Sequence, residues 1–170
     1  INNPVYPELD QVNGFVESNG YVSIEAVHFT KAIETDEIFW QVIPNLGRTL
    51  SAVTPFPVTI PRQTLDKDSP HLEYKIYFFT EGMVTVNLYL SPTLNFTNTP
   101  EANRYAISFD NNEPYSFYSS TKPNPPDLNY DPVWNKWVAN NINIQSLKLD
   151  LKEPGWHTLK FWMIDPGVVL

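Results

Sequence analysis

The residues of this chain best suited to chemistry are aromatic side chains set among amides, hydroxyls and arginines. A flat aromatic ring stacks on the C–H face of a sugar, while neighbouring polar groups bind the sugar hydroxyls. Three tryptophans fall in or beside predicted loops, namely Trp40, Trp134 and Trp137. The segment 91–96, Ser-Pro-Thr-Leu-Asn-Phe, adds Asn95 and Phe96 directly after an apolar run. These five residues are candidates for a carbohydrate site. The alternatives are core positions for the tryptophans and a self-hydrogen-bonded turn for 91–96.

Arginine is of interest because its planar guanidinium can bind a uronic acid carboxylate through two hydrogen bonds. The chain has three arginines, at Arg48, Arg62 and Arg104. Arg104 joins the candidate carbohydrate-binding residues, and Arg48 is the second arginine of interest. The alternative for both is a salt bridge to one of the nineteen acidic residues.

Patterns of catalytic residues are scarce in this sequence. It has no cysteine, and its three histidines, at positions 28, 71 and 157, lack the spacing of a metal-binding pair. It contains neither a glycine-rich phosphate loop nor a Gly-x-Ser-x-Gly elbow. We therefore expect a non-catalytic domain without a metal or cofactor. The alternative is a self-contained glycoside hydrolase that uses two of the nineteen carboxylates as its acid and base.

Composition limits the size and the partners of the protein. A chain of 170 residues with 42% apolar residues is large enough for one well-packed domain. The net charge of -8 repels phosphate backbones and anionic lipid surfaces, so we expect neither nucleic acid nor membrane partners. The chain starts at Ile1 without a methionine and stops within the apolar run 168–170. We expect a piece excised from a larger protein, with truncation of the last strand as an open alternative.

Alternating apolar and polar residues predict strands along most of the chain. Alternation over 21–26 predicts a first strand. The runs 72–78 and 84–90, separated by the turn residues Glu81 and Gly82, predict a hairpin. The runs 105–109 and 115–117 predict a second hairpin, because an Asp- and Asn-rich turn joins them; Pro114 favours an edge position for the second strand.

The C-terminal third adds one helix and one more hairpin. The runs 142–151 and 156–164 predict the hairpin, and a phase change in the first run predicts a bulge near residues 145–146. A short helix is predicted over 131–141, with Asp131 as its cap and Pro132 at its first position. Its tryptophans at 134 and 137 are expected on one face.

These elements favour an all-β fold, an antiparallel jelly-roll-like β-sandwich with one short helix. Sixteen prolines between many short strands argue against a parallel α/β sheet. We expect an N-terminal entry segment at 1–20 and a β-sandwich accessory domain at 21–170. The loop 119–131, rich in proline and asparagine, is expected to lead to the helix and to be suited to binding.

Five segments carry a resemblance to a known family. They lie in order along the chain at 22–30, 42–54, 89–96, 104–110 and 154–170, the last reading Pro-Gly-Trp-His-Thr-Leu-Lys-Phe-Trp-Met-Ile-Asp-Pro-Gly-Val-Val-Leu. Together they resemble the C-terminal domain of glycoside hydrolase family 115, the xylan alpha-glucuronidases, from about Gly20 to the last residue. In that family the catalytic residues lie in earlier domains.

The resemblance therefore implies a non-catalytic accessory domain of a glucuronoxylan-degrading protein, with a glycan-binding or a structural and interface role. It implies as partners a xylan-type polysaccharide or oligosaccharide and the catalytic domains of a parent hydrolase, and a secreted or periplasmic location. The opening segment is also similar to calcium-containing carbohydrate-binding β-sandwich modules. Glu25 matches their first acidic ligand, but Val27 occupies the second position and cannot bind calcium, so no metal is carried over.

Overall fold

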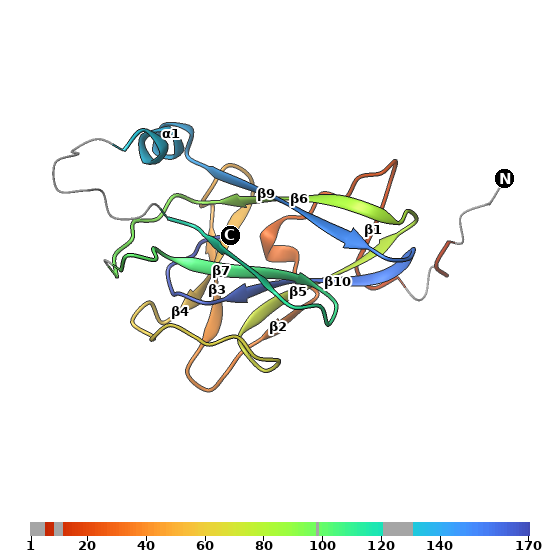
Figure 1. The fold of residues 1–170 in the computed structure, drawn as a ribbon, viewed down its shortest axis with the longest axis horizontal. Helices are drawn as coiled ribbons and strands as arrows, with labels where there is room; N and C mark the ends of the chain where they lie inside the picture. The colour runs from red at the N-terminus through yellow and green to blue at the C-terminus, as the bar shows by residue number, and fades with distance from the viewer. Residues whose placement is uncertain (1–5, 9–11, 98, 121–130) are drawn as a thin grey trace.

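The computed structural model describes residues 6–8, 12–97, 99–120 and 131–170, which form two facing β-layers and one α-helix (Figure 1). The first layer is a six-stranded sheet. Its main path runs β1 (Phe15–Val16), β5 (His71–Phe78), β10 (Gly155–Met163), β7 (Arg104–Phe109) and β8 (Tyr115–Tyr118). A short strand, β2 (Lys31–Ile33), also pairs with β5. Because β10 takes the other side of β5, β1 and β2 share one edge of that strand.

The second layer consists of two antiparallel strand pairs, and the last residues of the chain lie between them. β3 (Phe39–Pro44) pairs with β4 (Ser51–Phe56), and β6 (Gly82–Leu90) pairs with β9 (Asn143–Leu151). Val53 and Leu170 exchange backbone hydrogen bonds of 2.8 and 2.9 Å, and the amide of Ser91 donates to the carbonyl of Val169 at 2.9 Å. The apolar run 168–170 therefore lies between β4 and β6 and makes the layer continuous.

The core lies between the two layers and consists of inward-facing side chains from both. On β5 every second residue is buried, and on β9 the buried leucines again alternate with polar residues, at Leu72, Tyr74, Ile76, Phe78, Leu147, Leu149 and Leu151. Fully burying one such side chain contributes roughly 1.5–3 kcal/mol. This alternation confirms the predicted all-β antiparallel sandwich. The jelly-roll connectivity stays a prediction.

One of the three predicted hairpins is confirmed. β7 pairs with β8 from Arg104 opposite Tyr118 to Ile107 opposite Tyr115. Asp110, at the start of the turn, takes a left-handed conformation with φ of 52°, as its residue type allows. β8 ends the main path of the sheet, so the edge position that Pro114 predicted is also confirmed.

The other two predicted hairpins are wrong, because strands that are consecutive in sequence lie in opposite layers. β5 and β10 belong to the first layer, whereas β6 and β9 pair with each other in the second. The crossing from β5 to β6 is held by the buried carboxylate of Glu17, which accepts hydrogen bonds from the amides of Phe79 at 2.7 Å and Thr80 at 3.2 Å. Apolar alternation shows that a strand faces a core, but it does not choose the strand's partner.

Two local predictions are also wrong. The β6–β9 register runs without interruption from Gly82 opposite Leu151 to Leu90 opposite Asn143, so there is no bulge. Asn143 takes the inward position, and Ile144 points outward with 50% of its surface exposed. Residues 21–26 are not a strand: Tyr21 forms an isolated bridge with Ser18, and Ala26–His28 is a 3-10 turn. Their half-burial gives the alternation, but β1 and β2 occupy the edge of β5.

The predicted helix is confirmed as α1 (Pro132–Asn140), at one end of the sandwich beside β9 (Figure 1). The carboxylate of Asp131 accepts hydrogen bonds from the amides of Val133 at 2.9 Å and Trp134 at 3.0 Å. Asn141 ends the helix in a left-handed conformation, with φ of 52°. Residues 121–130 of the predicted loop 119–131, and residues 1–5 and 9–11 of the predicted entry segment, lie outside the described residues.

Candidate functional site

Trp40 is part of the core. The residue is 7% exposed, its ring packs edge-on against Phe161 at 6.1 Å, and its indole N–H donates to the carbonyl of Ile33 at 3.2 Å. Of the two interpretations of Trp40, the core position is therefore the one that the structure shows. Its position beside a loop did not reveal that β3 turns this side chain inward, so the ring has no free face for a sugar.

Asn95 and Phe96 belong to a turn that binds itself. The Asn95 side-chain amide donates to the carbonyl of Thr99 at 2.8 Å, and the hydroxyl of Thr97 donates to the Asn95 side-chain oxygen at 3.1 Å. Phe96 is 51% exposed, but an atom added at the Cα of Gly167 would lie 2.3 Å from its ring. The ring therefore covers Gly167 with one side and faces solvent with the other.

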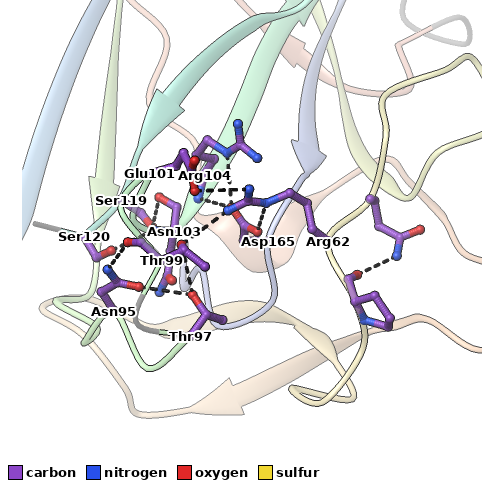
Figure 2. A network of polar contacts seen from close by, with 12 residues as sticks. Arg62, Asn95, Thr97, Thr99, Glu101, Asn103, Arg104, Ser119, Ser120 and Asp165 are labelled. Atoms are coloured by element: carbon purple, nitrogen blue, oxygen red, sulfur yellow. Dashed lines mark hydrogen bonds and ion pairs between the residues drawn. The ribbon is translucent and has the colours of Figure 1, made fainter. Parts of the chain in front are cut away.

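Arg104 is engaged in a buried ionic network (Figure 2). The carboxylate of Asp165 is 3% exposed and accepts a hydrogen bond from Arg62 Nε at 2.6 Å and one from the Arg104 amide at 2.9 Å. Arg104 Nε lies 3.4 Å from the same carboxylate. Figure 2 shows Arg62 pointing toward Asp165, the Nε contact of Arg104 with the same carboxylate, and Glu101 and Thr99 nearby.

This network stabilises charge that the fold has buried. The hydrogen bond to Asp165 raises the pKa of Arg62, partial burial opposes that rise, and the charges of Asp165 and Glu101 add to it. Arg62 also lies 3.6 Å from the Glu101 carboxylate. The second reading of Arg104, a salt bridge to an acid, is therefore what the structure shows, and its Nε is already committed to Asp165.

An open groove lies between α1, the start of β9 and the β3–β4 turn, and it contains one of the predicted tryptophans. The groove has a volume of about 440 Å³. Its lining combines an indole, two cations, an amide and apolar side chains, from Arg48, Pro132, Val133, Lys136, Trp137, Asn140, Ile142 and Ile144. Trp134 is half-buried on the same helix but is not part of this lining.

The helix supplies five of the eight lining residues, and four of these five lie on a single face. Val133, Lys136, Trp137 and Asn140 stand at positions i, i+3, i+4 and i+7, which coincide on one side of an α-helix. No residue of α1 is fully buried, so this face looks into the groove rather than into a core. The structure thus brings Trp137 together with Arg48, and it separates both from Asn95, Phe96 and Arg104.

Two of the three histidines are hydrogen-bonded within the fold, whereas His28 is exposed in the 3-10 turn Ala26–His28. The ring nitrogens of His71 lie 2.7 Å from the Ser69 carbonyl and 3.2 Å from the Glu73 carboxylate. Those of His157 lie 2.7 Å from the Asp110 carboxylate and 2.9 Å from the Glu153 carbonyl. Both nitrogens of each ring are occupied, which leaves neither free to act as a base on a substrate.

Metal ligands do not assemble among the residues that the structure describes: no group of three or more His, Asp or Glu side chains could hold an ion there. Glu25, which matches the first calcium ligand of the carbohydrate-binding modules, accepts a hydrogen bond from the Thr49 hydroxyl at 2.8 Å. None of the described helices is long and apolar enough to cross a bilayer.

Two layers of strands, all antiparallel except for the parallel pairing of β1 with β5, define an all-β sandwich domain with an aromatic groove at one end. The chain belongs to the family described as the glycosyl hydrolase family 115 C-terminal domain, whose model matches residues 14–170. This confirms the resemblance carried by the five ordered segments.

A solved structure shows a similar fold. It is described as a novel family GH115 4-O-methyl-alpha-glucuronidase with specificity for decorated arabinogalactans. The match has a TM-score of 0.56 and 20% identity and covers 88% of this chain but 17% of that chain. The likeness at this identity shows the fold, and the chain spans less than a fifth of that enzyme. No curated protein matches the sequence.

Sequence reasoning missed part of the groove. Lys136, Asn140 and Ile144 are not among the residues that the sequence predicts for the site, although the helical spacing of Lys136 and Asn140 around Trp137 is visible in the sequence. The apolar run 142–151, with its predicted bulge, places Ile144 in the core. Only the uninterrupted register with β6 shows that it points outward.

Proposed function

We propose that this domain is a non-catalytic accessory domain of a glucuronoxylan-degrading hydrolase and that it binds glycan in the groove beside α1. Membership of the family 115 C-terminal domain supports the association with a glycan-degrading enzyme. The groove is the single observation that carries the binding role, because it combines an accessible indole with polar groups in a space large enough for a sugar residue. The polymer substrate of such an enzyme also favours a secreted or periplasmic location.

The chemistry of the lining fits a sugar ring. Trp137 can stack on the C–H face, and the side-chain amide of Asn140, one helical turn away, can bind hydroxyls as donor and acceptor. The isoleucines at 142 and 144 add an apolar surface beside the indole. A xylan-type polysaccharide or oligosaccharide has both kinds of surface.

The test is retardation of the purified chain in gels that contain glucuronoxylan. Trp137→Ala should weaken retardation by roughly tenfold or more, because truncating an anchoring aromatic typically costs over 1.4 kcal/mol of binding free energy. Trp134→Ala is the matched control: it removes a half-buried tryptophan of the same helix that does not line the groove, and it should bind as the wild type does. The absence of retardation for the wild type would contradict the binding role, and release of uronic acid would contradict the non-catalytic role.

A structural and interface role is the second candidate, because one surface favours it. Tyr89 on β6 and Ile144 on β9 lie opposite each other in the strand register, on the outer face of the second layer. Tyr89 is 57% exposed and Ile144 is 50% exposed, and Ile144 also lines the groove. Contiguous exposed apolar side chains are typical of docking surfaces. For this role, Tyr89→Ser should weaken association with the catalytic domains of the parent hydrolase while retardation by glycan stays unchanged, because Tyr89 does not line the groove.

A further inference from the structure

The groove contains two cations without an acidic partner. Arg48, from the β3–β4 turn, and Lys136, from α1, both line it. Among the described residues neither makes an ion pair within 4.0 Å or a side-chain hydrogen bond. This is notable because the chain has nineteen acidic residues and eleven lysines and arginines. Two unpaired cations converging on one groove in an acidic protein attract an anion to that place.

Resting on the proposed glycan-binding function, we infer that the groove recognises the carboxylate of a uronic acid residue. Arg48 and Lys136 bind the carboxylate, and Trp137 stacks on the ring that carries it. Lys136 and Trp137 are consecutive on the helix and both face the groove, so charge and ring face are presented together. A neutral sugar would use the indole and the Asn140 amide but would leave both cations without a partner.

The surroundings of Arg48 support this assignment. The carboxylate of Glu25 accepts a hydrogen bond from the hydroxyl of Thr49, the residue after Arg48, at 2.8 Å. No ion pair joins Glu25 to Arg48 in the described structure. Arg104, in contrast, is bound to Asp165. Of the two arginines suited by type to a uronic acid, Arg48 is the one with an uncommitted guanidinium.

A second occupant would have similar chemistry. An acidic and apolar segment of a partner protein could place a carboxylate between the cations and a side chain on the indole. The glycan is favoured because the chain belongs to a glycosyl hydrolase family and because a single ring face with one amide suits a sugar. The two occupants can be told apart by experiment. If the groove binds the glycan, chemical reduction of the carboxyl groups of the glycan lowers its affinity for the domain.

The experiment compares glucuronoxylan with the same polymer after reduction of its carboxyl groups to alcohols. The wild-type chain should bind the reduced polymer roughly fivefold to tenfold more weakly, as expected for the loss of two exposed ionic contacts. Arg48→Gln with Lys136→Gln should bind both polymers equally, at the level of the wild type on the reduced polymer. The matched control, Lys31→Gln with Lys67→Gln, removes two charges from exposed positions outside the groove and should discriminate as the wild type does.

The outcomes distinguish failure of carboxylate recognition from failure of the glycan-binding function. Equal binding of both polymers by the wild type would overturn carboxylate recognition and leave the glycan-binding function in place. Discrimination that survives in the groove double variant would overturn the assignment of Arg48 and Lys136. No binding to either polymer would overturn the glycan-binding function itself, and with it this inference.

Discussion

Replacing Asp165 with asparagine should destabilise the domain without changing its shape. The carboxylate is 3% exposed and carries three contacts, with Arg62 Nε at 2.6 Å, the Arg104 amide at 2.9 Å and Arg104 Nε at 3.4 Å. Asparagine has nearly the same volume, but its charge is zero and one of its two acceptor oxygens becomes an NH₂ donor. The substitution therefore tests the ionic network rather than the packing.

The magnitude follows from the contacts. A hydrogen bond to a charged group contributes about 1.5–3 kcal/mol when buried. Arg62 and Arg104 are 34% and 25% exposed, so solvent screening lowers the value of their side-chain contacts to about 1 kcal/mol or less each. The contact with the Arg104 amide survives if the remaining oxygen faces it. We expect Asp165→Asn to cost about 2 kcal/mol, and Asp165→Ala about 3–4 kcal/mol because it also leaves that amide unpaired.

Urea denaturation measures this change as a shift of the midpoint at constant slope. Asp68→Asn is the control: Asp68 lies 3.8 Å from Lys67, with its side chain 82% exposed, and its loss should cost less than about 0.5 kcal/mol. Arg62→Gln, alone and combined with Asp165→Asn, should reveal a coupling of about 1 kcal/mol. A stability of Asp165→Asn within about 0.5 kcal/mol of the wild type would refute the reasoning.

Two further predictions concern stability. Burial raises the pKa of both Tyr74 and Tyr105. Near pH 10 these tyrosines ionise in the unfolded chain but not in the folded chain, so their contribution to stability is complete below pH 10 and falls above it. At pH 11 the loss is about 1.4 kcal/mol per tyrosine. Tyr105→Phe should therefore narrow the stability difference between pH 9 and pH 11 measured in urea, and an unchanged difference would contradict the burial argument. Gly167→Ala should cost about 1–3 kcal/mol, because φ is +78° and the new carbon would lie 2.3 Å from the Phe96 ring. Gly47→Ala, with φ of +100° and nothing within 4 Å, should cost less, and equal costs would exclude the contact with Phe96 as the cause.

The sequence predicts elements well where the signals are local. Asp131, Pro132 and Asn141 specify the start and end of α1 by side chain and backbone chemistry within one turn, and the helix has the predicted position. The β7–β8 hairpin is similarly specified by its short Asp- and Asn-rich turn. The partners of β5, β6, β9 and β10 depend instead on contacts between distant residues, which alternation alone does not define.

The candidate site shows the same division between local and distant information. Trp40 and Trp137 are both tryptophans near loops. The side chain of Trp40 on β3 points into the core, whereas that of Trp137 on α1 lines a groove. Arg48 and Arg104 are likewise equivalent by type. Only Arg104 meets Asp165, which is 61 residues further along the chain, and no local pattern reveals that pairing.

The buried polar residues at the end of the sandwich nearest α1 connect the network to the groove. The backbone of Asn103, next to Arg104, is bonded to Ser119 and Ser120, and the side chain of Asn143 donates to the Ser119 carbonyl at 3.0 Å. Asn143 directly follows Ile142 and precedes Ile144, two residues of the groove lining. The buried network therefore fixes the strand from which the apolar part of the groove projects. Under the proposed glycan-binding function, a rigid apolar surface would require less ordering when a sugar binds, so the affinity of the groove would depend on residues that never contact the ligand.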